Sequence, residues 1–579
     1  MVNVRLVFLH CVLAFPSLKR ISACTIFSAK DPKGNVWFGN NEDAAFSFNN
    51  FINVFPKSAS NRYGYYSLSR GKPENGENAQ MAGGMNEAGL IFDFNSTQLY
   101  PVKNIFFKKK YPGGDHAILN YLLGNFEHVE DVVTFFDQYW FQFGFRSAQM
   151  HLADRFGHFA LVSPTGSRVV NQSDFQISTN YDICSKADST SCWRYPIVKK
   201  ELEKKVAGLK SFIQICQLTA QGRYTNYSSI SNLNTGEITF VFGGEYSKPY
   251  KTSLKQLLQK GRNSYSMEKV FTEHSINKIF KVYQSEGIEA AYSYYQGLNL
   301  SEKEKEILVP NLVEYFVTGI NNYEIYPFLN EYLNNYSAEL DYWLVKAAIE
   351  YQRGELVKSL ETIDTTKIKF VHQQALITAF MNRLQGKFDE NSNAYFTLNG
   401  YENAQFVIVK SKSIQSTFSP LNNITFLTKT KGQWILNLKL EPGVYDYVFV
   451  VNGKEILEKT IPVKFIKNLI GENVQCHQLC LGMSEAVHKI TVEVSVPNKE
   501  DEVYIVGNQE AIFKAHLTMM EFASEFNRSL TTSVHFPATF KLVSGGGKKK
   551  AVIKGMEDQP FIVINDLKDL KKYEIISWK

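Results

Sequence analysis

The sequence has no apolar run long enough to cross a membrane as a helix, because the run at 6–15 is too short. Such a helix needs about 20 consecutive apolar residues, and no later stretch approaches that length. Neither sign of charge dominates: 63 basic residues are interleaved with 57 acidic ones, and the densest basic runs, Lys108–Lys110 and Lys548–Lys550, are short. We therefore expect no transmembrane segment and no nucleic-acid partner.

Motifs of cofactor and metal chemistry are also missing. The chain has no glycine-rich phosphate-binding loop, no dinucleotide-binding fingerprint and no cysteine or histidine cluster with zinc spacing. His116 and His151 do not make a convincing Cys–His pair, because isolated histidines are usually structural or solvated. We expect neither a cofactor nor a metal.

Cysteine is scarce, with seven in 579 residues. Cys184 with Cys192, or Cys476 with Cys480, could form small-loop disulfides in an oxidising compartment. Buried free thiols explain these residues equally well. The sequence leaves the two readings open.

The first 23 residues (1–23) have the order of a secretory signal peptide. A charged start precedes a largely apolar run at 6–15, and Ile21-Ser22-Ala23 ends in a small residue just before Cys24. Lys19 and Arg20 are uncommon so close to a cleavage point. We expect an exported protein, periplasmic or secreted, whose mature chain begins at Cys24.

At this length we expect two to four domains. Changes in hydrophobic pattern divide the mature chain into a mixed α+β domain, a helical spacer with a tetratricopeptide-like helix pair, a small β-sandwich and a second β-rich module. The expected ranges are 24–262, 263–390, 391–470 and 487–579.

Local patterns predict the main elements. Expected strands are 25–29, 35–39, 89–94, 151–162, 238–242, 396–398, 405–409, 434–440, 445–451, 490–496, 503–506 and 561–564. Expected helices of the first domain are 116–123, 129–139 and 195–206.

The position of Cys24 allows three interpretations. Ile21-Ser22-Ala23-Cys24 resembles a lipoprotein box, in which the thiol is acylated and tethers the protein to a membrane. The thiol could instead be a nucleophile whose own freed α-amine is the general base. The third interpretation is a buried strand cysteine.

Four ordered motifs resemble the N-terminal-nucleophile hydrolases of the choloylglycine hydrolase and penicillin V acylase type. They are Cys24–Phe27 leading to Phe38–Asp43, then Met85–Leu90, Ile177–Asn180, and Ser191–Arg194. Nineteen residues separate Cys24 from Asp43, as in the family. The resemblance covers roughly 24–261 and implies a four-layer αββα core.

The resemblance also implies roles for individual residues. Cys24 would attack the amide carbonyl, and its α-amine would move the proton to the leaving amine. Asp43 would hold that amine. Asn180 would donate to the oxyanion, with Asn95 as the second donor, although Ser96 occupies the strictly aligned position.

Two further positions concern charge at the site. Choloylglycine hydrolases have an arginine where this chain has Asn40, which puts bile-salt hydrolysis in doubt. Acyltransferases of the isopenicillin type also lack that arginine, so activity as such is not excluded. Arg194 matches the segment that carries the family's late active-site arginine and could supply the missing positive charge.

The β-rich part from Phe396 to Lys454 resembles glycogen-binding modules, which stack sugar rings on exposed aromatic side chains. Trp434 is its one matched aromatic, and core packing explains Trp434 equally well. Val503–Asn508 faintly resembles a strand of starch-binding modules. Both modules are predicted to be structural or protein-binding scaffolds, with glycan contact as the alternative.

The resulting prediction is an exported hydrolase that cleaves a linear, non-peptide amide C–N bond of a small-molecule substrate. One alternative is an inactive hydrolase fold used as a binding or adaptor protein, and another is a lipoprotein modified at Cys24. Aromatic residues in the loops hint at an apolar acyl pocket, although core packing explains them equally well; they are Tyr63, Tyr65, Tyr66, Phe106 and Phe107.

Overall fold

The structure is a computed structural model. It describes residues 24–43, 50–71, 80–98, 100, 102–140, 144–171, 173–181, 184, 192–319, 324–336, 338, 340–385, 392–411, 425–430, 432–440, 442–467, 473–507, 509, 518–559 and 561–579. The predicted signal peptide lies outside these residues. Among the helices of the described residues, none is long and apolar enough to cross a membrane.

Six strands form the first sheet, and every neighbouring pair in it is antiparallel. Its order is β12 (Phe175–Ser178), β1 (Thr25–Lys30), β2 (Val36–Asp43), β13 (Thr225–Asn232), β14 (Glu237–Phe242) and β15 (Tyr250–Ser253). In this register Ile26 lies opposite Ser178, and Thr25 lies opposite Asn41. Cys24, directly before β1, therefore lies between the end of β2 and the residues that follow β12.

Eight strands form the second sheet. Its order is β11 (Gly166–Val170), β10 (Phe159–Ser163), β9 (Ala148–Ala153), β6 (Ile91–Ser96), β5 (Gln80–Asn86), β4 (Tyr65–Arg70), β3 (Asn50–Phe55) and β16 (Asn263–Ser266). The single strand predicted at 151–162 is in fact the hairpin β9–β10, whose turn contains Gly157 at φ +86°. β16 lies beyond the predicted boundary at 262 but pairs with β3, so the mixed domain extends at least to Ser266.

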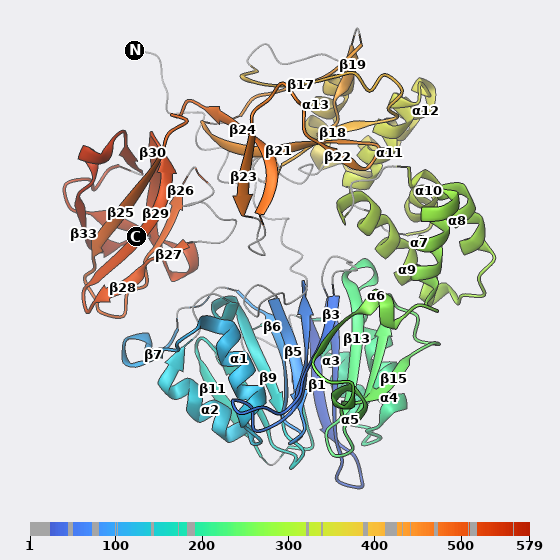
Figure 1. Ribbon diagram of the computed structural model, residues 1–579, viewed down its shortest axis with the longest axis vertical. Helices are drawn as coiled ribbons and strands as arrows, with labels where there is room; N and C mark the ends of the chain where they lie inside the picture. Colours follow the sequence, from blue (N-terminus) through green and yellow to red (C-terminus); the bar gives the residue numbers. More distant parts are fainter. Residues whose placement is uncertain are drawn as a thin grey trace.

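An apolar core fills the space between the two sheets, with Ile26 and Phe38 from the first and Ile52 and Met85 from the second. α1 (Gly114–Asn125) and α2 (Val129–Gln138) cover the outer face of the second sheet, and α3 (Arg194–Leu202) and α4 (Leu209–Thr219) cover that of the first. The layers therefore run helices, sheet, sheet, helices (Figure 1). β1 is buried on both faces, so even its polar residues Thr25 and Ser28 are inaccessible to solvent.

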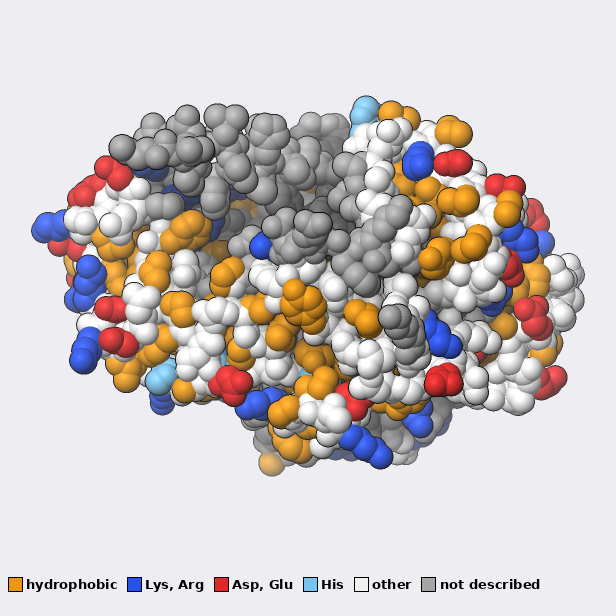
Figure 2. All heavy atoms as spheres, turned by 90° about the horizontal axis from the view of Figure 1, so that it is seen from above, with side chains coloured by type: hydrophobic (Ala, Val, Ile, Leu, Met, Phe, Trp, Pro, Cys, Tyr) orange, Lys and Arg blue, Asp and Glu red, His pale blue; other side chains and the backbone are white. Residues whose placement is uncertain are grey.

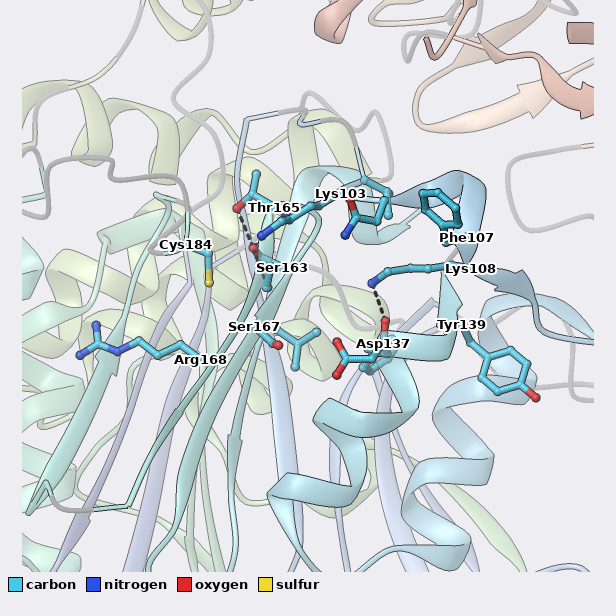
Figure 3. A pocket seen from close by; sticks show the side chains of 15 residues that line it. Lys103, Phe107, Lys108, Asp137, Tyr139, Ser163, Thr165, Ser167, Arg168 and Cys184 are labelled. Carbon is cyan, nitrogen blue, oxygen red and sulfur yellow. Dashed lines mark hydrogen bonds between the residues drawn. The ribbon is translucent and has the colours of Figure 1, made fainter. Parts of the chain in front are cut away.

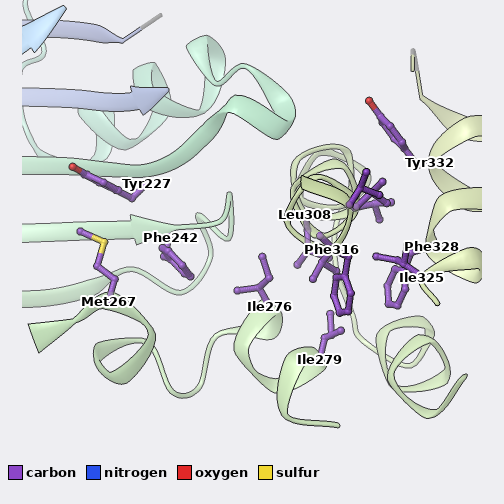
Figure 4. Packing of buried hydrophobic residues seen from close by; sticks show 14 of the residues in the cluster. Tyr227, Phe242, Met267, Ile276, Ile279, Leu308, Phe316, Ile325, Phe328 and Tyr332 are labelled. Carbon is purple, nitrogen blue, oxygen red and sulfur yellow. The ribbon is translucent and has the colours of Figure 1, made fainter. Parts of the chain in front are cut away.

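The helices after β15 begin with α5 (Leu254–Gln259), which precedes β16, and continue beyond the two sheets. The others are α6 (Met267–Val270), α7 (Ser275–Glu286), α8 (Ile288–Gln296), α9 (Glu302–Glu314), α10 (Tyr326–Asn335), α11 (Leu340–Gln352), α12 (Leu356–Lys369) and α13 (Gln374–Leu384). Their apolar faces continue the core of the sheets: Phe242, Met267, Ile276 of α7 and Leu308 of α9 belong to one buried cluster (Figure 4). The helical part thus packs directly onto the mixed domain.

The next region is a small β-sandwich around Phe396, Trp434 and Phe449. One sheet contains β17 (Ala394–Asn399), β20 (Gln433–Leu438) and β19 (Thr428–Thr430), and the other contains β18 (Val407–Lys410), β21 (Gly443–Val451), β22 (Lys454–Ile456), β24 (Asn473–Leu481) and β23 (Val463–Lys467). Trp434 is 3% exposed and donates from Nε1 to the Tyr401 carbonyl oxygen, so it belongs to the core.

β24 falls in the stretch 471–486, between the two expected β modules. It pairs with β21 and β23 and therefore belongs to the β-sandwich. Cys476 and Cys480 both lie on this strand. Four residues of strand span about 13 Å, whereas disulfide-linked Cα atoms lie within about 7 Å. The Cys476–Cys480 disulfide is therefore excluded. Cys192 is also a free thiol in the structure, which contradicts the Cys184–Cys192 pairing.

The C-terminal module is a second β structure with its own core. Its strands run in the order β27 (Thr518–Met519), β26 (Tyr504–Gly507), β30 (Ala538–Ser544), β31 (Lys549–Ile553), β33 (Lys572–Trp578), β25 (Val487–Ser495), β29 (Asn527–His535) and β28 (Glu521–Ser524), with β32 (Ile562–Ile564) beside β30.

On the described surface seen from above, hydrophobic side chains are scattered among charges of both signs (Figure 2).

Candidate functional site

The structure brings all five predicted site residues together, and Arg194 connects them. Arg194 begins α3 and is 3% exposed. Its Nη1 donates to the Cys24 carbonyl oxygen at 3.1 Å and lies 3.4 Å from Asp43 Oδ2. Its Nη2 donates to Asn180 Oδ1 at 2.8 Å. A guanidinium presents several donors in a rigid plane, so this one side chain aligns three elements around Cys24.

The two asparagines approach Cys24 from different sheets. Asn95 is buried on β6 and donates from Nδ2 to the Cys24 carbonyl oxygen at 2.9 Å. Asn180 follows β12 and donates from Nδ2 to the backbone carbonyl oxygen of Ser96 at 2.7 Å. Of the two candidates on β6, Asn95 thus directs its side chain at Cys24, whereas Ser96 contributes its backbone.

Asp43 ends β2 on the side that faces the helices. Its carboxylate accepts hydrogen bonds from the Thr225 hydroxyl, at 2.6 Å, and from the Gln221 amide. Burial raises the pKa of Asp43 to about 7, although the Arg194 charge and these hydrogen bonds act in the opposite direction. Sequence reasoning missed Thr225 and Gln221, because only the pairing of β13 with β2 brings them to Asp43.

The Cys24 sulfur faces the other way, into the space between the sheets. Its Sγ lies 3.6 Å from Glu42 Oε2. Burial raises the pKa of the Cys24 thiol well above its usual range, and the carboxyl groups of Glu42, Asp43 and Asp93 raise it further. Sequence reasoning missed Glu42 as well. The period-two pattern of β2 would have placed it on the same face as Phe38 and Asn40.

Asn40, on the same strand as Asp43, is completely buried. It donates from Nδ2 to Asp93 Oδ2 at 2.8 Å. Burial and the nearby Glu42 raise the pKa of Asp93 well above its usual range. The sulfur side of the site is therefore acidic, and Arg194 contacts the carbonyl oxygen of Cys24 on the other side.

Cys192 is a second thiol close to Arg194. Burial opposes its ionisation, but the neighbouring Thr179 side chain, the Arg194 charge and backbone N–H groups outweigh burial and lower the pKa of Cys192. A cysteine with a lowered pKa beside an arginine has the environment of a reactive thiol. Any labelling experiment on Cys24 must take Cys192 into account.

His151 has the structural role that its sequence suggested. It is fully buried between the sheets, with Nε2 2.8 Å from Ser28 Oγ and Nδ1 2.8 Å from Ser178 Oγ. Burial lowers the pKa of His151 to about 3. A neutral ring therefore joins β1, β9 and β12. The side chain of His116 lies outside the described residues.

A cavity of about 630 Å³ lies beside the second sheet, next to the ends of β10 and α2 (Figure 3). Lys103 and Lys108 line it, and Lys108 Nζ donates to the carbonyl oxygen of Phe136 at the end of α2. The five site residues are not among its described lining residues.

The aromatic residues expected to shape an acyl pocket are dispersed. Tyr65 and Tyr66 are 1% exposed and belong to two different cores. Tyr63 donates from its hydroxyl to Glu127, and Phe107 lines the cavity of Figure 3. The side chain of Phe106 lies outside the described residues. For Tyr65 and Tyr66, core packing is the correct explanation.

No family model matches the chain, and no curated protein matches it. Among solved structures, a variant of conjugated bile acid hydrolase from Clostridium perfringens is 15% identical over 42% of this chain and 96% of its own, with a TM-score of 0.33. Penicillin V acylase from Agrobacterium tumefaciens is 14% identical over 42% of this chain and 90% of its own, with a TM-score of 0.32.

Proposed function

We propose that the protein is an exported hydrolase of linear, non-peptide amides, built on an N-terminal-nucleophile fold, whose nucleophile is Cys24 once the preceding residues have been removed. The convergence on Cys24 carries this proposal. Asn95 reaches it from one sheet and Arg194 from the helix outside the other, and both donate to the same carbonyl oxygen. A structural strand cysteine does not need two buried polar side chains directed at it.

The raised pKa of the Cys24 thiol makes a general base necessary. A freed α-amine has a pKa near ~8 and lies on the same residue as the sulfur. It would take the thiol proton as Sγ attacks the amide carbon, then pass that proton to the leaving amine as the C–N bond breaks. Water, deprotonated by the same amine, would then cleave the resulting thioester, release the acid and restore the thiol.

The tetrahedral intermediate needs donors for its oxyanion. Each amide nitrogen of Asn95 and Asn180 carries two hydrogens, of which one is used in the contacts to the Cys24 and Ser96 carbonyl oxygens. The second hydrogens are available for the oxyanion. Preorganised donors of this kind contribute about 3–4 kcal/mol each. Asp43, held by Thr225 and Arg194, would fix the amine side of the site.

The test combines the mature N-terminus with selective labelling. Intact-mass analysis should show a chain that begins with unmodified Cys24. In a Cys192→Ala background, a thiol-reactive amide analogue should label the protein stoichiometrically, and a further Cys24→Ala change should abolish labelling, whereas Cys480→Ala should leave it unchanged.

Other outcomes would contradict the mechanism. Residues retained before Cys24 would block the amine, and a large lipid increment would support a lipoprotein anchor instead. A free Cys24 that does not label would point to a hydrolase fold used for binding. If such a binding protein recognised glycans, it would use side chains other than Trp434, which is buried.

A further inference from the structure

Two histidines and two carboxylates meet on the outer side of the second sheet, where the β9–β10 turn lies against the start of α2. His128 is the residue directly before α2, and Glu130 lies in the first turn of that helix. Asp154 follows β9 and His158 precedes β10. Metal-binding atoms of His128, Glu130 and Asp154 lie within 4.8 Å of one another.

His158 lies next to two members of this group. Its Nδ1 lies 3.0 Å from Glu130 Oε1 and 3.8 Å from Asp154 Oδ2. The spacing of these residues in the sequence matches no zinc motif, so sequence reasoning missed the group. The fold assembles it from two segments that lie more than twenty residues apart.

The surroundings hold these side chains in place. Asp154 Oδ1 accepts the backbone N–H groups of Phe156 and His158, and its Oδ2 accepts that of Val129 at 3.2 Å. The His128 ring stacks on Phe156 with 4.6 Å between centroids. Asp154, the buried member of the set, is therefore fixed before an ion binds, which reduces the entropic cost of binding.

We propose that His128, Glu130, Asp154 and His158 bind a divalent transition-metal ion, with zinc as the best fit. Two imidazole nitrogens and two carboxylate oxygens form a ligand set that zinc accepts in tetrahedral geometry, at bond lengths of about 2.0–2.2 Å. Closure around the ion requires the ligand atoms to move inward from their present separations, and the half-exposed His128, Glu130 and His158 can do so.

Charge supports the same conclusion, because the carboxylates of Asp154 and Glu130 lie close together and a dication would neutralise their combined negative charge. The dication would also link α2 to the β9–β10 hairpin as a structural clamp, a role that does not depend on amide hydrolysis.

The experiment uses the untagged, full-length protein after removal of metals with a chelator. Zinc chloride is titrated by calorimetry, and cobalt(II) is added in parallel because a tetrahedral site gives it intense visible absorption. We expect saturable uptake of one ion per chain. We also expect a rise in the melting temperature on addition of zinc.

His128→Ala, Glu130→Gln and His158→Ala should each weaken zinc binding at least tenfold and remove the rise in melting temperature, roughly the scale seen when metal-site partners are changed. His372→Ala, which removes an exposed histidine of the helical part, is the matched control and should bind like the unmodified protein. Circular dichroism checks that each variant is folded. Absence of saturable uptake, or an affinity unchanged in all three variants, would overturn the proposal.

Discussion

Arg146 and Glu502 form a buried ion pair that joins the mixed domain to the C-terminal module across 356 residues of sequence, and each side chain is 2% exposed. Glu502 Oε1 also accepts the backbone N–H of Val102 at 2.9 Å. Arg146 Nη1 donates to the Tyr504 hydroxyl at 2.6 Å. These buried contacts anchor the C-terminal module to the mixed domain. Separating the two would leave the charges of Arg146 and Glu502 unpaired, which is unfavourable.

Substitution of Glu502 by Ala should destabilise the protein by about 3–5 kcal/mol, because it leaves Arg146 buried without its counter-charge. Urea unfolding measures the loss, and limited proteolysis should release the C-terminal module sooner. The double change Arg146→Met with Glu502→Leu should recover part of the stability, because it removes the lone buried charge but still leaves the Val102 N–H and the Tyr504 hydroxyl without their acceptor. Glu525→Ala, at an exposed ion pair with Lys499, is the matched control and should have little effect. Equally small losses of stability at Glu502 and Glu525 would show that the buried Arg146–Glu502 pair contributes no more to stability than an exposed ion pair.

Asn95→Ala and Asn180→Ala should each lower the rate of Cys24 acylation by about 10²–10³-fold, as expected when one oxyanion donor is lost. The measurement is the rate of labelling by the amide analogue in the Cys192→Ala background. Asn498→Ala, at an exposed position in the C-terminal module, is the control and should react normally. If either site variant labels at the normal rate while circular dichroism shows a native fold, that asparagine is not an oxyanion donor.

Asp43 should make the stability of the protein fall as the pH rises. Its pKa is about 7 in the folded state, raised by burial from an ordinary value of 3.8. The folded state therefore favours the protonated carboxyl of Asp43. The contribution of Asp43 to the free energy of unfolding is complete below pH ~4. It is lost between about pH 4 and 7, by at most ~4 kcal/mol.

Asp43→Asn removes the titrating group but keeps a side chain of the same shape. Urea unfolding of both proteins between pH 4 and 8 should show that the unmodified protein loses stability relative to the variant as the pH rises. A difference that is constant with pH would show that Asp43 has an ordinary pKa.

Much of the site could be predicted from the sequence because its residues lie in short local motifs. Asp43 follows Cys24 after one hairpin, and Asn180 and Arg194 each lie in their own recognisable segment. The residues that were missed depend on distant pairing instead. Thr225 reaches Asp43 only through the register of β13, which the local pattern does not specify.

Two strands, β16 and β24, lie outside the predicted ranges of the domains to which they belong, for a related reason. β16 has the sequence Asn-Ser-Tyr-Ser and is an edge strand, so it lacks the apolar residues by which a strand is recognised. β24 is similarly rich in polar residues. Only their backbone pairing with β3 and β21 identifies them as parts of the sheets.

His151 should have the opposite pH dependence from Asp43. Burial lowers its pKa to about 3 from an ordinary 6.5, so folding favours the neutral ring. This contribution is present above pH ~6.5 and is lost as the pH falls toward about 3, by up to ~1.4 kcal/mol for each pH unit. His151→Gln keeps hydrogen-bonding groups for Ser28 and Ser178 but cannot be protonated in this range. Between pH 4 and 6.5 its unfolding free energy should therefore fall less steeply than that of the unmodified protein, as measured by urea unfolding. Parallel curves for the two proteins would mean that the buried ring of His151 is not the group that titrates.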